Sequence, residues 1–244
     1  MIRLSPHHDL PALAAAYAAH GRLQVRDLMV PGDAEYARSL LMQTPWSLAF
    51  NEGSKVHRLS PEEQARLTPQ QAAQLMAGVR QRASSQFQFL YDYDPVFVRY
   101  FAPGHPRMPS FEVYEFLNSP EMIAFFRALT GLDDIRWADG QATLYRPGHF
   151  LKVHDDINHQ EKRRAAYVLN LTQGWQRDWG GYLQFFDANG DIEAGFRPSF
   201  NAVNVFTVPA QHNVETVASF ATQPRLSLTG WLRADDPPGR FGRG

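Results

Sequence analysis

The sequence contains no cysteine. This absence excludes disulfides, cysteine-ligated zinc, iron–sulfur clusters and thiol nucleophiles, so any metal must be held by His, Asp or Glu. Neither sign of charge is in excess, because 24 Lys and Arg residues face 25 Asp and Glu residues. This balance argues against a nucleic acid or an anionic membrane as a partner.

Long apolar runs are also missing. No run approaches the ~20 apolar residues of a membrane span. The Ala-rich start of the chain has His7, His8 and Asp9 before Leu10, whereas a secretory signal has a basic start and an unbroken apolar run. We therefore expect a cytoplasmic protein. The hydrophobic fraction of 44% is enough for one sizeable core, while the oligomeric state has no signature in the sequence.

Helix-start signals recur in the first half of the chain. Two capping boxes, Ser60 to Glu63 and Thr68 to Gln71, each place a proline at the first helical position. Ser119–Pro120 and Gly131 predict the start and the end of another helix. Asp33 is expected to cap a further one.

From about Ile135 the chain changes to short β-rich segments separated by turns, and "DANGD" between two of them predicts a hairpin. Many short strands with little helix between them predict a sandwich, barrel or jelly roll. We expect one domain over 1–233, in which a helix-rich part, 1–134, packs on a β core of about 135–233. The polar tail 234–244, rich in Pro and Gly, is expected to be flexible.

One segment within the helix-rich part has the pattern of a strand. Phe87, Phe89, Tyr91 and Tyr93 alternate with other residues, which predicts a strand with an aromatic face. We favour packing of this face in the core. The alternative is an aromatic wall over a binding site.

The stretch "YRPGHFLKVHDD", Tyr145 to Asp156, places His154 and Asp156 on one face of a strand. On its own, a His-x-Asp pair is best interpreted as a hydrogen-bonded pair at a strand edge. His212, however, lies beside a strand downstream, and two imidazoles with one carboxylate form the facial triad of non-haem Fe(II) oxygenases. The charged run 158–164 that follows the pair is expected to be a solvated loop.

Arg225 begins another alternating segment and shares a face with Ser227 and Thr229. An arginine that points into a β core is unfavourable unless it meets an anion, and its planar fork suits a carboxylate. The alternative is an arginine at a strand start with its head in solvent. Tyr145, nine residues before His154, could reach the same pocket or be an ordinary core tyrosine.

These segments together resemble the 2-oxoglutarate- and Fe(II)-dependent dioxygenases, in particular the prolyl 4-hydroxylase-like branch that includes the oxygen-sensing enzymes. The resemblance covers about Ile135 to Arg233. It rests on an ordered set of motifs: His-x-Asp, a Gly-Gly before a strand, a distal His, and an Arg with a Trp six residues later. It implies a mainly β fold with α, in which N-terminal helices pack against a double-stranded β-helix (jelly-roll) core.

The resemblance also implies roles for individual residues. Three of them would be the iron ligands of the catalytic centre: His154, Asp156 and His212. Arg225 would bind the distal carboxylate of 2-oxoglutarate. Tyr145 and Thr229 would be further contacts of this co-substrate.

The implied reaction hydroxylates an unactivated C–H bond with Fe(II), 2-oxoglutarate and O₂, and it releases succinate and CO₂. Ascorbate is an additional candidate cofactor. Related halogenating enzymes lack the carboxylate ligand, so Asp156 favours hydroxylation. We expect the substrate to be a prolyl residue of a protein or peptide. One alternative is a free amino acid or other small molecule, and another is a catalytically silent jelly-roll binding module.

Overall fold

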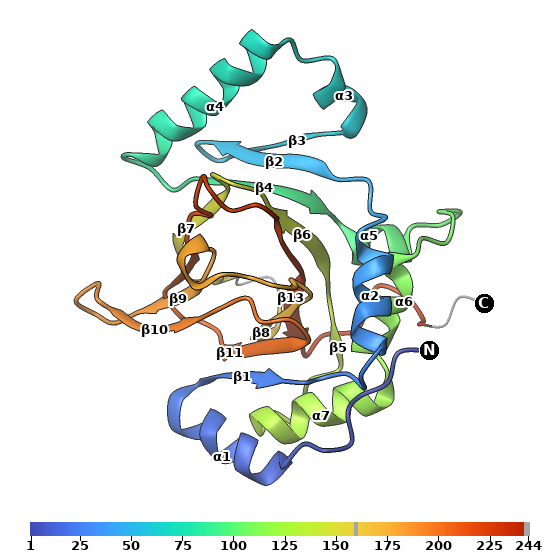
Figure 1. Cartoon of the computed structure of the whole chain (residues 1–244). Helices are drawn as coiled ribbons and strands as arrows, with labels where there is room; N and C mark the ends of the chain where they lie inside the picture. The colour runs from blue at the N-terminus through green and yellow to red at the C-terminus, as the bar shows by residue number, and fades with distance from the viewer. Residues whose placement is uncertain (159–160, 242–244) are drawn as a thin grey trace.

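The computed structural model describes residues 1–158 and 161–241. Its strands form one antiparallel sheet that closes almost into a barrel, with the helices on the outside (Figure 1). The helices are α1 Leu10–His20, α2 Asp33–Leu41, α3 Pro61–Ala65, α4 Pro69–Ala83, α5 Val96–Phe101, α6 Ser110–Leu117 and α7 Pro120–Thr130. The strands are β1 Arg22–Arg26, β2 Ser47–Glu52, β3 Lys55–Leu59, β4 Phe89–Asp94, β5 Trp137–Ala138, β6 Gln141–Tyr145, β7 Phe150–His154, β8 Arg163–Asn170, β9 Leu183–Phe186, β10 Ile192–Phe196, β11 Ala202–Thr207, β12 His212–Val214 and β13 Arg225–Arg233. This jelly roll confirms the predicted fold class.

Two walls of strands enclose the interior of the barrel. One wall has the order β1-β11-β8-β13-β6-β4, and the other has the order β7-β12-β9-β10. Strand β4 joins the walls, because Asp92–Asp94 pairs with β6 while Phe89–Leu90 pairs with β7. At the two ends of this order, Arg22 of β1 and Glu193 of β10 form an ion pair with 2.6 Å between nitrogen and oxygen.

The main hydrophobic core lies between the helices and the outer face of the larger wall. Side chains of β8 alternate between the two faces of that wall. Tyr167 and Leu169 point outward into the core, where the Tyr167 ring lies 6.0 Å from the ring of Phe126 in α7. Ala166 and Val168 point into the barrel. The helices thus hold the wall from outside and leave small side chains inside.

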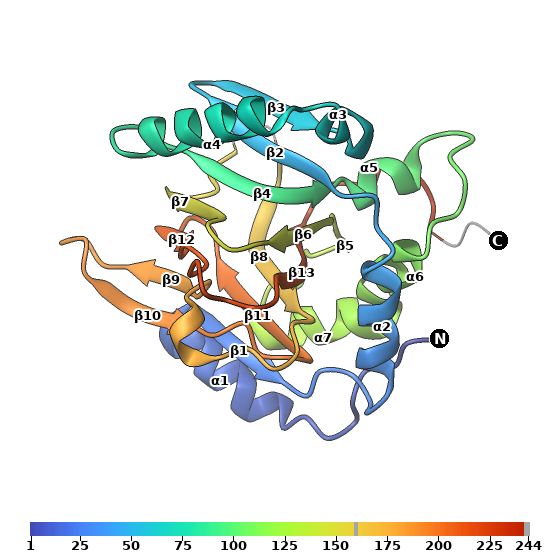
Figure 2. The ribbon, with the colours of Figure 1, turned by 45° about the horizontal axis from the view of Figure 1, so that its top comes forward.

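A second layer covers the barrel above β4. The β2–β3 hairpin extends the sheet from β4, and α4 packs on its outer face (Figure 2). Leu48, Phe50 and Leu90 form a buried cluster there with Val79 of α4. The sequence analysis did not predict this hairpin, nor strand β1, within the helix-rich part.

The helix caps follow local sequence rules. Ser60 and Glu63 cap α3 reciprocally, as do Thr68 and Gln71 in α4, and Ser119 caps α7. The prediction for Asp33 was wrong: this residue is the first of α2, and its carboxylate accepts three hydrogen bonds from Arg3 instead.

The C-terminal segment lies against the helical part of the molecule. The ring of Phe241 lies 5.8 Å from Tyr100 and 5.3 Å from Phe101. Residues 242–244, the end of the predicted tail, lie outside the described residues, and the flexibility of 234–244 stays a prediction. Within the described ranges, no helix combines the length and the apolar character needed to cross a membrane.

The turn between β6 and β7 buries His149, which is 6% exposed. Burial lowers the pKa of His149 to about 4, below the value of about 6.5 expected in the unfolded chain. Between these values the unfolded chain binds more protons, so the free energy of unfolding falls as the pH falls from 6.5 toward 4. We predict that His149 accounts for about 2 kcal/mol of lost stability between pH 7 and pH 5. Denaturant unfolding measures this. The free energy of unfolding of His149→Leu should fall by about 2 kcal/mol less between pH 7 and pH 5 than that of the wild type. The control, the same change at exposed His7, should behave as the wild type does.

Candidate active site

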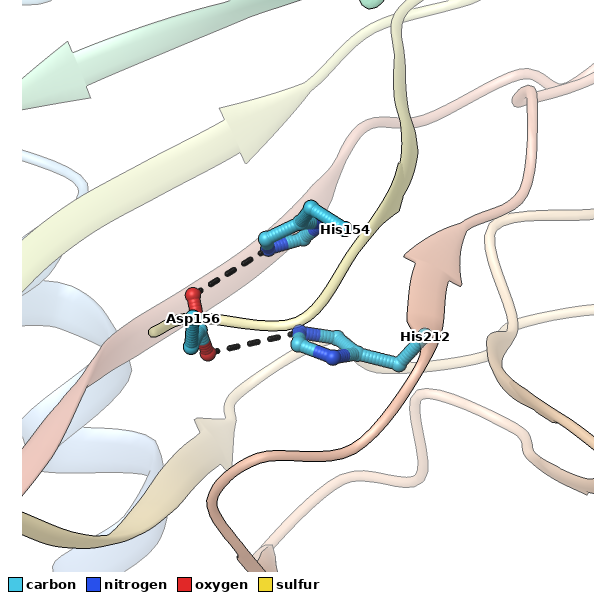
Figure 3. Close-up of side chains that lie close together, drawn as sticks. All are labelled: His154, Asp156 and His212. Atoms are coloured by element: carbon cyan, nitrogen blue, oxygen red, sulfur yellow. Dashed lines mark ion pairs between the residues drawn. The ribbon is translucent and has the colours of Figure 1, made fainter. Parts of the chain in front are cut away.

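Three potential metal ligands meet where β7 and β12 pair. The register places His154 directly opposite His212, and their ring centroids are 4.1 Å apart. Asp156 follows β7 and turns its carboxylate between the two rings (Figure 3). Its oxygens lie 3.2 Å from Nε2 of His154 and 3.5 Å from Nε2 of His212. One ligand atom from each residue fits within 4.8 Å of the others, an arrangement that can hold a metal ion.

Backbone contacts orient both imidazole rings. Nδ1 of His154 lies 3.0 Å from the carbonyl of Lys152, and Nδ1 of His212 lies 2.7 Å from the carbonyl of Ala210. Since a carbonyl only accepts hydrogen bonds, Nδ1 carries a proton in both rings, and Nε2 is the nitrogen of each ring that is left to bind a metal. Metal-binding histidines are commonly held in this way.

The protonation states also favour a cation. Burial and the neighbouring His154 lower the pKa of His212 to about 4. Burial opposes the charge of Asp156, but its hydrogen bond and ion pair with the histidines prevail and lower its pKa. The same contacts outweigh burial at His154 and raise its pKa. At neutral pH the site therefore offers an ionised carboxylate and a neutral His212.

A cavity of about 210 Å³ extends from these residues into the barrel, and Arg225 lines it. Arg225 is 1% exposed. Its Nη1 donates a 3.4 Å hydrogen bond to Ser227, while its buried Nε has no hydrogen-bond partner among the described residues. Burial lowers the pKa of this guanidinium. A buried cation without a carboxylate partner is costly, and an anionic ligand in the cavity would remove that cost.

Tyr145 and Thr229 both line the same cavity. Tyr145 pairs with Arg225 across β6 and β13, and its ring centroid lies 5.1 Å from the guanidinium carbon. Burial raises the pKa of Tyr145, so it stays a neutral phenol. Thr229 donates its hydroxyl proton to the carbonyl of Tyr167 at 2.9 Å.

The sequence analysis missed Thr143, which also lines the cavity. Its hydroxyl lies 2.9 Å from that of Ser227. Its place two residues before Tyr145 puts it on the same face of the strand, so the alternation could have indicated it.

The aromatic strand forms part of the cavity wall. Phe89 and Tyr91 line the cavity, as the alternative interpretation expected, while Tyr93 is not among its lining residues. Phe89 is also buried, so part of this face packs in the core as well. Phe87 also lines it and is 46% exposed, with its ring 6.0 Å from the ring of His154. Lys152 does not face this site, since its ammonium donates to two carbonyls between α4 and β4.

Two glycines let the chain pass close to Thr216 and Arg225. Gly180 and Gly181 have positive φ angles of 63° and 67°. A Cβ on Gly180 would lie 2.3 Å from the carbonyl oxygen of Thr216, and one on Gly181 would lie 3.4 Å from Cδ of Arg225. This close approach explains the Gly-Gly pair before β9.

Comparisons with known proteins agree with this geometry. Residues 140–233 match the model of the 2OG-Fe(II) oxygenase superfamily. The matched segment, which is less than half of the chain, is similar to the oxygenase domains of this superfamily. Over 116 residues the chain is 32% identical to the mouse (Mus musculus) protein prolyl 3-hydroxylase OGFOD1, a match that covers 45% of this chain and 21% of that protein. The chain spans about a fifth of the length of the curated relatives it matches.

Solved structures share the fold of the barrel and of the helices around it. A Pseudomonas putida prolyl-4-hydroxylase aligns with a TM-score of 0.55 and 21% identity, covering 93% of this chain and 100% of that one. A prolyl hydroxylase from Trichoplax adhaerens, in complex with a hypoxia inducible factor peptide, aligns with a TM-score of 0.59 and 12% identity, covering 92% and 89%.

The oxygenase superfamily implies Fe(II) and 2-oxoglutarate, and the residues present fit both. Two imidazole nitrogens and one carboxylate suit Fe(II) and leave coordination positions open. The buried guanidinium of Arg225 suits a carboxylate of 2-oxoglutarate.

We predict that the three residues of Figure 3 hold the metal. His154→Ala and His212→Ala should abolish Fe(II) retention, because two remaining ligands do not hold a divalent ion firmly. Asp156→Ala should weaken Fe(II) binding for the same reason. Anaerobic calorimetry with Fe(II) measures the binding, and His57→Ala, a change on β3, is the control. Fe(II) affinity equal to that of the wild type in Asp156→Ala would disprove the assignment.

Proposed function

We propose that this protein is an Fe(II)- and 2-oxoglutarate-dependent dioxygenase that hydroxylates a prolyl residue of a protein or peptide. Succinate and CO₂ are the co-products. The observation that carries the proposal is Arg225, a buried cation without a carboxylate partner among the described residues, in the same cavity as the three potential metal ligands.

The chain contributes binding and orientation. His154, Asp156 and His212 would hold Fe(II), which supplies the oxidative chemistry when it is bound with 2-oxoglutarate and O₂. Arg225 would hold the distal carboxylate of 2-oxoglutarate. The aromatic side chains of β4 line one side of the cavity. Thr229 and Tyr145 would complete the lining around the co-substrate.

The size and the rim of the cavity support a polypeptide substrate. About 210 Å³ must take both 2-oxoglutarate and the reacting group, which leaves room for one side chain rather than for a separate drug-sized molecule. Phe87, which lines the cavity and is 46% exposed, offers apolar surface to a pyrrolidine ring. The relatives named above are prolyl hydroxylases, which supports proline as the target.

Several expectations from the sequence stay predictions. These are the cytoplasmic location, the use of ascorbate, the absence of nucleic-acid and membrane partners, and the single domain over 1–233. A free amino acid or other small molecule is the second candidate substrate. A catalytically silent binding module would not need Arg225 buried without a counter-ion, so that alternative is less favoured.

We predict that Arg225→Ala weakens 2-oxoglutarate binding on the order of 10- to 100-fold, because a charge-assisted bidentate contact is lost. Metal binding should be unchanged. Anaerobic calorimetry with Fe(II) measures the metal binding. A visible band that requires Fe(II) and 2-oxoglutarate together measures the co-substrate affinity. Unchanged 2-oxoglutarate affinity in Arg225→Ala would disprove the assignment of this residue, and exposed Arg26→Ala is the matched control.

The activity itself is tested with the wild-type protein, Fe(II), 2-oxoglutarate and a library of proline-containing peptides. We expect a mass increase of one oxygen on proline, with succinate formed in equal amount. Amino-acid analysis of the product separates 3-hydroxyproline from 4-hydroxyproline. Oxidation of free amino acids alone would favour the small-molecule alternative, and no charge-transfer band with bound iron would favour the binding module.

A further inference from the structure

Asp156 has a backbone conformation that needs support. Its φ angle is +62°, in the left-handed region that residues with a side chain seldom adopt. This conformation directs the carboxylate back between the two histidine rings (Figure 3). The backbone carbonyl of Asp156 accepts a 3.1 Å hydrogen bond from Nη1 of Arg163, the first residue of β8.

Arg163 is itself held on several sides. Its guanidinium carbon lies 3.4 Å from the centre of the Trp231 ring, in a stacked position. Its Nε and Nη2 each lie 2.7 Å from one carboxylate oxygen of Glu161. The Arg163 side chain is 15% exposed. The planar guanidinium of Arg163 therefore contacts Asp156, Trp231 and Glu161 at once. The compact ammonium of a lysine could not stack on the ring and make the same hydrogen bonds.

The contacts of Glu161 continue into the barrel wall. Its carboxylate also lies 3.3 Å from Nη1 of Arg233, at the end of β13. The same Nη1 lies 3.0 Å from the carboxylate of Asp139, which is 2% exposed. Arg163 is thus tied through Glu161 and Arg233 to a buried carboxylate, rather than to a flexible surface group.

Trp231 connects this network to the ligand from the other side. Its indole lines the same cavity as Asp156, and the buried indole nitrogen has no hydrogen-bond partner among the described residues. Arg163 packs on the Trp231 ring and bonds the backbone of Asp156. A single side chain therefore supports both the backbone of the ligand and the ring beside its carboxylate.

We propose that Arg163 is a positioning residue that sets the conformation of Asp156 as a metal ligand. This inference rests on the proposed function, since it assumes that Asp156 binds the metal. Loss of a group that orients a metal ligand commonly costs 10- to 100-fold in metal affinity. A purely structural arginine would instead change the stability of the fold and leave metal affinity unchanged.

The test compares Arg163→Gln with Arg164→Gln. Arg164 is the next residue along β8, and it is more exposed and paired with Asp134 instead. Calorimetry of the metal-free proteins with Mn(II) should show affinity reduced roughly 10- to 100-fold in Arg163→Gln and unchanged affinity in Arg164→Gln. The visible spectrum of bound Co(II) should change in Arg163→Gln only.

Each outcome bears on a different claim. Wild-type affinity and an unchanged Co(II) spectrum in Arg163→Gln overturn the role of Arg163, even where its melting temperature falls. If Arg163→Gln does not fold, Glu161→Gln decides: weaker Mn(II) binding supports the network, and wild-type binding overturns it. If the wild-type protein itself binds no Mn(II), the proposed metal site fails and this inference fails with it.

Discussion

The direct pairing of His154 with His212 across β7 and β12 is the constraint on which the site depends. Side chains alternate along a strand, so a slip of one residue in either strand would turn one imidazole away from the other. The register of β12 is held on both sides, because His212 also pairs with Phe185 of β9. The register and the hydrogen bonds from both Nδ1 atoms to carbonyls fix the two rings. The geometry of the three potential ligands then depends on where the carboxylate of Asp156 lies.

The opposite wall gives this pair an enclosed space in which to act. Its outer face is anchored by large side chains such as Tyr167, which pack under α7. Its inner face carries the smaller Ala166 and Val168, and this difference in volume leaves the cavity open. The pairing of β13 with β6 then brings Arg225 beside Tyr145 in that cavity. The helices therefore contribute to the cavity, because the large side chains of this wall pack against them and the small ones face the interior.

Features coded by neighbouring residues were predictable from the sequence, and features made by distant contacts were not. The capping boxes and the alternation that turns Arg225 inward are local patterns. Strand β1 and the β2–β3 hairpin are short, and they are strands because they pair with β11 and β4. Residues 158–164 were interpreted as a solvated loop, with His159 and Gln160 outside the described residues. Arg163 departs from that interpretation because Trp231, 68 positions away in the chain, supplies its packing surface.

The cavity has Arg225 at one end and the proposed metal site at Asp156 at the other. Both ends carry positive charge once a metal is bound, so one anionic ligand that reaches both is favoured. Without one, Arg225 keeps an uncompensated positive charge in a buried place. A divalent ion held by Asp156 and neutral histidines leaves one net positive charge at the other end. A dicarboxylate with two negative charges neutralises both ends at once, whereas a monocarboxylate would leave one of them unmatched. On the proposed function, 2-oxoglutarate meets this condition, and electrostatic neutrality thus selects a dianion before any contact with the substrate is made.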